Sequence, residues 1–423
     1  MVNLDLQRIQ NLRKAHIDKK INEINSADAK LVCTFTPRFS VYEDDNNYYF
    51  FDKYWLNLTE IQKIKIKVIK GVQFNIGLFI QGFLPFVLEV PGLKIKDRAS
   101  YDGDNFFWQF PCATERDFFE RNIRTKKIHF SSAEVNVYVP MPWATFIDSG
   151  SYNAAVIETI ASRLRYATKY LRSVGYKVRV HTCCQHVRWQ DAFKHFNKLA
   201  ITDLWISHKK KNEDYFQGMD LHAWSLYATN YEDESRSQGL TAKSMESKKF
   251  LASFVGAYMP HYLSSHRLAL KKLNVDKSYR VVVSDVWHYE KIVYQGQMKA
   301  LDEKSLNELT DESSVYFYNK TLSDSVFSLC PEGAGPNTIR IWESLAIGSI
   351  PVVISDSLEI PCPKGFKKDE ITEIIVKVKS EDLESIDNIL RNINVAKVKS
   401  MQIKGVAFYK RMKNECILNR VGS

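Results

Sequence analysis

Four residues near position 340 combine the chemistry needed to hold a phosphorylated ligand. Gly333 and Gly335 precede a predicted helix that carries Arg340 and, three positions later on the same face, Glu343. Glycine lets backbone N–H groups approach a phosphate closely, and a helix N-terminus attracts anions. An arginine there can bind phosphate through two parallel hydrogen bonds, and a nearby carboxylate can accept hydrogen bonds from sugar hydroxyls such as those of a ribose. The spacing therefore predicts an anion site beside a site for sugar hydroxyls.

Two predicted strands position this loop and helix. One strand includes Val326 and precedes the glycines, and the other ends at Ile354 after the helix. Strand, loop, helix and strand form a βαβ unit, in which ligands bind at the carboxyl ends of the strands. Asn337 is predicted to cap the helix, with any ligand contact secondary. Asp356 follows the second strand, where it either binds substrate or caps a turn, and the sequence leaves both interpretations open.

The segment from 326 to 361 resembles the nucleotide-sugar site of exostosin-like glycosyltransferases. It reads Phe-Ser-Leu-Cys-Pro-x-Gly-x-Gly-Pro, then Arg, Glu, and Gly-x-Ile-Pro-Val-x-x-Ser-Asp. The resemblance implies transfer of a sugar from a nucleotide sugar, with UDP as the expected nucleotide, to a glycan hydroxyl with inversion of the anomeric centre. It implies donor binding by Gly333, Gly335, Asn337, Arg340 and Glu343.

The same resemblance implies an α/β fold of the GT-B type, with two Rossmann-like domains facing a central cleft. A length of 423 residues independently favours two domains. We expect an acceptor-binding domain at 1–248 and a nucleotide-sugar-binding domain at 249–395. Residues 396–423 are compatible with a final helix that crosses back to the first domain.

The first half contains a predicted strand, helix and strand that end at His186. The family has a similar run on its acceptor side, but its Gly-Arg-Asp-His is replaced by Cys-Cys-Gln-His in this chain. Inverting transfer needs a base for the acceptor proton, and histidine titrates near neutral pH. His186 is therefore the predicted catalytic base. Carboxylates of the first half remain alternatives, namely Asp102, Asp104, Glu115 and Asp191.

A second cation for the donor phosphates is predicted at Arg267. It follows a Phe-x-Gly strand at 254–256, where the family places an arginine that reaches towards the donor. Two arginines and helix N–H groups can offset the charge of a leaving diphosphate without a metal. Asp102-x-Asp104 is interpreted as a loop, and His261 and His266 lack the spacing of a zinc pair. We therefore expect no metal and no cofactor other than the nucleotide-sugar co-substrate.

Composition limits the partners. The chain is 45% hydrophobic and has a net charge of +10, which suits a globular protein with anionic ligands. The basic residues form no stripe interleaved with aromatic residues, so nucleic acid is not an expected partner. The run Lys209–Lys211 is interpreted as a solvated loop. The expected acceptor is a glycan or a lipid-linked oligosaccharide, and peripheral membrane contact stays open.

The sequence has no apolar stretch typical of a signal peptide or membrane anchor at its N-terminus, and its 7 cysteines form no disulfide framework. We therefore expect a cytoplasmic enzyme, bacterial or viral, or a chain cut after its anchor. Two other functions remain open. One is a transferase of related architecture that uses a CMP-sugar, and the other is a non-catalytic glycan-binding protein on the same fold.

Overall fold

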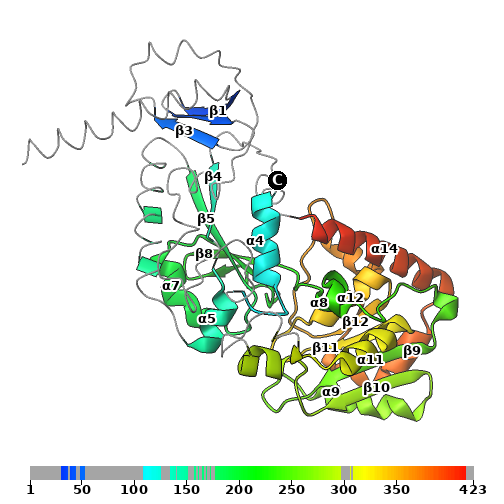
Figure 1. Ribbon diagram of the computed structural model, residues 1–423. Helices are drawn as coiled ribbons and strands as arrows, with labels where there is room; N and C mark the ends of the chain where they lie inside the picture. The colour runs from blue at the N-terminus through cyan, green and yellow to red at the C-terminus, as the bar shows by residue number, and fades with distance from the viewer. Residues whose placement is uncertain are drawn as a thin grey trace, which may run out of the picture.

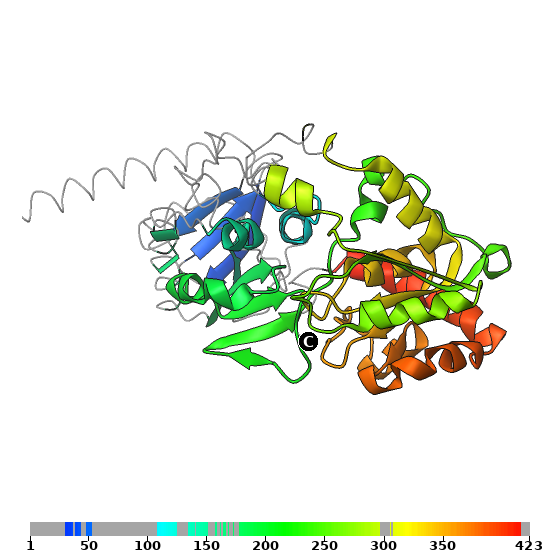
Figure 2. The same ribbon diagram turned by 90° about the horizontal axis from the view of Figure 1, so that it is seen from below.

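The structure is a computed structural model of the chain. It describes residues 30–36, 39–43, 48–52, 108–124, 134–139, 141–150, 177–296 and 308–415, with a few helical positions between 157 and 172 and at 305. Two α/β units lie side by side, each built on a five-stranded sheet (Figure 1). The view from below shows the same two units joined along one boundary (Figure 2). A separate antiparallel sheet holds β1 (Lys30–Thr36), β2 (Phe39–Glu43) and β3 (Tyr48–Asp52).

The first unit has the strand order β4-β5-β6-β8-β7. Its strands are β4 (Glu134–Tyr138), β5 (Lys177–Cys184), β6 (Asp203–Ile206), β7 (Tyr215–Phe216) and β8 (Met219–Ala223). The first four strands of the order are parallel and only β7 runs antiparallel. Its helices include α4 (Thr114–Arg124), α5 (Trp143–Ser149), η2 (Trp189–Ala192) and α7 (Phe193–Lys198). A cluster of buried aromatic side chains, including Phe118, Trp205 and Trp224, packs α4 against the sheet.

Short helical segments join the first unit to the second. They are α8 (Thr229–Glu232), η3 (Glu234–Arg236) and η4 (Met245–Ser247). The second unit has an entirely parallel sheet of order β10-β9-β11-β12-β13. Its strands are β9 (Phe250–Ala257), β10 (Tyr279–Ser284), β11 (Ser325–Pro331), β12 (Ile350–Ile354) and β13 (Val376–Val378). All five residues of β12 are buried, as expected for a strand covered on both faces.

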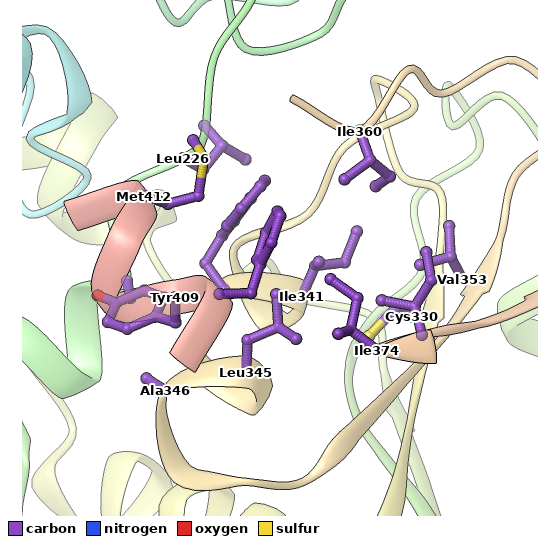
Figure 3. Packing of buried hydrophobic residues seen from close by; sticks show 14 of the residues in the cluster. Leu226, Cys330, Ile341, Leu345, Ala346, Val353, Ile360, Ile374, Tyr409 and Met412 are labelled. Atoms are coloured by element: carbon purple, nitrogen blue, oxygen red, sulfur yellow. The ribbon is translucent and has the colours of Figure 1, made fainter. Parts of the chain in front are cut away.

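The helices of the second unit follow its strands. They are α9 (His266–Ala269), η5 (Leu270–Val275), η6 (Lys291–Gly296), α11 (Glu312–Ser323), α12 (Ile339–Ile347), η8 (Lys368–Glu373), η9 (Ser380–Ser385), α13 (Ile386–Arg391) and α14 (Val395–Lys413). α12 ends at Gly348, whose φ of 69° is the left-handed conformation that glycine adopts readily. The apolar faces of α12 and α14 pack together over the sheet, with Leu345 and Tyr409 among the buried residues (Figure 3).

The carboxyl ends of the two sheets face each other. Residues 207–211 follow β6, and they contact segments that follow β11 and β12 of the second unit. Asn337 Nδ2 donates to Ser207 O at 2.7 Å, and Lys210 forms an antiparallel bridge with Leu358. Two Rossmann-like sheets that meet through these edges form the predicted α/β architecture.

The last helix, α14, lies along the second unit, and its carboxyl end approaches α4 of the first unit (Figure 1). There Arg121 Nη1 donates to Met412 O at 2.7 Å, and Lys413 pairs with Glu232. No helix in the part of the chain that the structure describes is long and apolar enough to cross a membrane.

Candidate functional site

The predicted phosphate loop lies between β11 and α12, at the carboxyl edge of the second sheet. Gly333 N donates to Gly335 O at 3.0 Å, which closes a tight turn. The N-cap of α12 is Thr338, so the prediction that Asn337 caps the helix is wrong by one residue. Asn337 instead accepts hydrogen bonds through Oδ1 from Thr338 N at 2.8 Å and Trp342 Nε1 at 3.2 Å. Its side chain therefore fixes the start of the helix from one position earlier.

Arg340 lies buried beneath this loop. Its guanidinium donates to the carbonyl oxygens of Val255 and Leu329, which lie near the carboxyl ends of β9 and β11. The cation also lies 4.4 Å from the centre of the Phe254 ring. A Cβ atom at Gly256 would come within 3.1 Å of Arg340 Nη2, so this strand position leaves room for the guanidinium. The fold thus holds Arg340 in one orientation at the sheet edge.

Arg267 lies beside Arg340 and is equally buried. Its guanidinium donates to Ala257 O at 2.7 Å and to Glu332 O at 3.0 Å, and it lies 4.7 Å from the Tyr262 ring centre. Burial, and then the positive charge of Arg340, lower the pKa of Arg267 to about 10. A Cβ atom at Gly333 would come within 2.8 Å of Arg267 Nη2, so this glycine makes room for the second arginine.

The two arginines form a buried pair of like charges. Among the described residues, no carboxylate makes a salt bridge with either guanidinium, and carbonyl oxygens and aromatic faces are their partners. Burying cations without a counterion is costly, because the attraction of water is lost. The arrangement therefore favours an anion at this edge.

Glu343 lies one turn further along α12 and is almost completely buried. Its Oε1 accepts from Asn230 N at 2.9 Å, and its Oε2 accepts from the hydroxyl of Tyr318. Burial raises the pKa of Glu343, although both hydrogen bonds act in the opposite direction. Each carboxylate oxygen can accept a second hydrogen bond. The two hydrogen bonds thus set the orientation of the Glu343 carboxylate within the chain.

Gly335 contacts the first unit. A Cβ atom at this position would come within 2.3 Å of His208 Nδ1 and 2.7 Å of Val187 Cγ1. His208 Nδ1 also accepts from Asn337 N at 3.4 Å. Close packing of the two units thus requires a glycine at 335. This requirement comes in addition to any phosphate contact.

His186 follows β5 on the facing edge of the first unit. Its Nε2 is 2.9 Å from Asp148 Oδ1, and its Nδ1 accepts from Arg188 N at 3.0 Å. Asp148 is in turn held by Gln109, whose Nε2 donates to Oδ2 at 2.7 Å. A proton on Nε2 and a lone pair on Nδ1 satisfy both contacts. A carboxylate that orients an imidazole in this way is the arrangement used in general-base catalysis.

The other carboxylates predicted as alternatives lie in different settings. Glu115 is buried under the edge, where its carboxyl group accepts from the backbone N–H groups of Gln185 and Ala144. Burial raises the pKa of Glu115 to about 8. Asp191 is exposed, and its carboxylate lies 3.6 Å from the guanidinium of Arg188. Asp102 and Asp104 lie outside the described residues.

Two loop segments that the sequence singled out make specific contacts in the structure. Lys209 is only 2% exposed, because it pairs with Glu359 and with Asp214, so the prediction of a solvated loop is wrong at this position. Asp356 Oδ1 accepts from Ser380 N at 3.2 Å, and its carbonyl accepts from Lys211 Nζ at 2.6 Å. Asp356 thus joins the loop after β12 to the start of η9, and both interpretations of its role stay predictions.

Sequence reasoning missed Asp148 and His208. Asp148 lies in the last turn of α5, and no local pattern connects it to His186. His208 could have been found, because it follows a buried strand just as His186 does. Within the described residues, no three His, Cys, Asp or Glu side chains gather as a metal site would require.

Comparison with known proteins gives a family and several partial relatives. Residues 182–393 match the Exostosin GT47 domain. An 85-residue stretch is 31% identical to "Probable glucuronoxylan glucuronosyltransferase IRX7" of Arabidopsis thaliana, covering 20% of this chain and 18% of that protein. An 84-residue stretch is 32% identical to "Probable beta-1,4-xylosyltransferase IRX10" of the same plant, covering 20% of this chain and 19% of that protein.

An 84-residue stretch is also 36% identical to "Probable glucuronosyltransferase Os01g0926700" of Oryza sativa subsp. japonica, with coverage of 20% and 19%. The matched stretches thus span about a fifth of the length of these curated relatives. Among solved structures, an O-GlcNAc transferase mutant of Thermobaculum terrenum aligns with a TM-score of 0.35 and 12% identity, over 73% of this chain and 62% of that one.

Proposed function

Since the chain belongs to the exostosin GT47 family of glycosyltransferases, we propose that it transfers a sugar from a nucleotide sugar to a hydroxyl of a glycan acceptor. The expected nucleotide is UDP, and the expected outcome is inversion of the anomeric centre, in polysaccharide or glycan biosynthesis. The second unit is the proposed donor domain and the first is the proposed acceptor domain.

The observation that carries this proposal is the buried pair Arg267 and Arg340, for which the described part of the chain supplies no carboxylate counterion. A diphosphate is an anion of the right charge for two guanidinium groups. Its negative charge grows as the glycosidic bond breaks, so fixed cations stabilise the transition state more than the ground state. Because the arginines supply this charge, we propose that transfer needs no metal and persists in EDTA.

The proposed reaction is a single displacement. His186 Nδ1 takes the proton of the acceptor hydroxyl, after that hydroxyl displaces the Arg188 N–H contact. The acceptor oxygen forms a bond to the anomeric carbon as the bond from this carbon to the diphosphate oxygen breaks. The electron pair leaves with the diphosphate towards Arg267 and Arg340. Attack from the side opposite the leaving group inverts the configuration.

The named activities of the relatives suggest donors for testing. The relatives are named as probable glucuronosyltransferases and a probable xylosyltransferase. UDP-glucuronic acid and UDP-xylose are therefore the first donors to test, with xylan oligosaccharides as acceptors. Release of UDP with acceptor present supports the proposal, and NMR of the product reports the anomeric configuration. Titration of UDP and CMP by calorimetry separates the two donor classes.

A matched pair of variants tests the site. Arg340→Lys keeps one positive charge but cannot donate to both strand carbonyls, so UDP affinity should fall at least tenfold. Arg280→Lys changes an exposed arginine on β10 of the same unit and should leave UDP affinity unchanged. Absence of binding by any nucleotide to the wild-type protein would contradict the proposal and favour a glycan-binding role without catalysis.

A further inference from the structure

We propose that His208, a residue of the first unit, completes the donor site by donating its Nε2–H group to the diphosphate of the nucleotide sugar. The inference rests on the proposed function, since it assumes that a nucleoside diphosphate binds beside Arg267 and Arg340. It adds a donor group from the unit opposite the glycine loop. The diphosphate would then be held from both sides of the boundary between the units.

The position of His208 supports this role. It follows β6 and lies against Gly335, whose missing side chain leaves the space that the imidazole occupies. Gly335 lies two residues from Gly333, which makes the corresponding space for the guanidinium of Arg267. The same short turn therefore contacts the His208 imidazole of the first unit at Gly335 and the buried Arg267 guanidinium of the second unit at Gly333.

The hydrogen bond of Nδ1 determines the tautomer of His208. Nδ1 accepts from Asn337 N at 3.4 Å, immediately before α12, so the proton of a neutral imidazole lies on Nε2. The positive end of the α12 dipole also disfavours a charged ring. Burial, and then the charge of nearby His186, lower the pKa of His208 to about 3. The ring is therefore a neutral hydrogen-bond donor at neutral pH.

Nε2 of His208 has no acceptor among the described residues, although its ring partner Nδ1 is engaged. Hydrogen bonds to charged acceptors are stronger than those to neutral ones, and phosphate oxygens are such acceptors. A neutral imidazole also adds a donor without adding a third positive charge beside Arg267 and Arg340. Because Nε2 already carries a proton, this nitrogen cannot take the proton of the glycan hydroxyl. His208 therefore acts as a hydrogen-bond donor, whereas His186 acts as the base.

Two substitutions separate the two nitrogens of His208. In His208→Asn the side-chain amide reaches the position of Nδ1 and can keep the Asn337 contact, but nothing replaces Nε2. In His208→Gln the amide reaches the position of Nε2 and can restore the donor. Affinities for UDP and uridine should be measured by calorimetry for both variants and the wild-type protein, with thermal unfolding as the check on folding.

We expect His208→Asn to weaken UDP binding about tenfold, which corresponds to one lost hydrogen bond to a charged group, and to leave uridine binding unchanged. His208→Gln should recover most of the UDP affinity. Equal loss of UDP and uridine affinity, or UDP binding by His208→Asn at the wild-type level, would overturn the inference while leaving the proposed function intact. Failure of the wild-type protein to bind UDP would overturn both.

Discussion

Gly335→Ala is the substitution whose effect the structure defines most closely. The new Cβ would lie 2.3 Å from His208 Nδ1 and 2.7 Å from Val187 Cγ1, and contacts below 3.0 Å do not occur in real proteins. Gly335 does not have a positive φ, so backbone strain adds nothing and the cost is steric. Overpacking of this kind costs about 1–3 kcal/mol. The side chains of His208 and Val187, or the boundary between the units, must therefore shift, and the Asn337–His208 hydrogen bond should weaken or break.

A double-mutant cycle with His208→Ala tests this reasoning. Removing the imidazole first should relieve the closer of the two clashes, whereas the Val187 clash persists. We therefore expect a coupling of about 1 kcal/mol between the two substitutions, measured by the shift of the thermal midpoint at fixed ionic strength. Gly256→Ala is a milder comparison, because its nearest contacts would be 3.1 Å to Arg340 Nη2 and 3.2 Å to Phe254 Cζ. Strictly additive effects of Gly335→Ala and His208→Ala would refute the packing argument.

Three further perturbations have defined outcomes. Asp148→Asn should lower kcat by roughly 10²–10⁴ with little change in KM, because His186 loses the charged group that orients its ring. Asp191→Asn is the control, since that exposed carboxylate should leave kcat unchanged; equal effects would argue against His186 as the base. Glu115 has its folded pKa raised from 4.5 to about 8, so its contribution to stability is present below pH 4.5 and is lost as pH rises towards 8. In the wild-type protein the thermal midpoint should fall between roughly pH 5 and pH 8, and Glu115→Gln should make this fall smaller. A variant with the same pH profile as the wild-type protein would contradict this reasoning. Transfer activity should survive EDTA, and its loss, restored by a divalent cation, would contradict the metal-free mechanism.

The donor-side elements could be predicted because their signals are local. The apolar strand, the glycine turn, the helix with Arg340 and the buried strand ending at Ile354 appear in the structure where the sequence indicates them. The start of α12 differs by one residue, because Asn337 binds Trp342 and the first unit instead of capping the helix. A sequence pattern shows which residues share an element, but not which partner competes for a side chain.

Contacts between distant residues account for what the sequence could not show. Lys209 looked like part of a solvated basic run, yet Glu359, 150 positions away, neutralises it in a buried pair. Asp148 reaches His186 across 38 positions, through the packing of α5 on the first sheet. The need for glycine at 335 also depends on the first unit, since the clashing atoms belong to His208 and Val187.

The short bridge between Lys210 and Leu358 has a consequence for the design of chimaeras. Backbone hydrogen bonds run both ways across it, from Lys211 N to Ser357 O at 2.8 Å and from Glu359 N to Lys209 O at 3.0 Å. The backbone pairing tolerates many sequences, but the ion pair of Lys209 and Glu359 does not. A hybrid that joins the first unit of one relative to the second unit of another should therefore carry both charges from the same parent. Exchanging segments 207–211 and 355–359 together would transfer both the backbone pairing and the ion pair between the units.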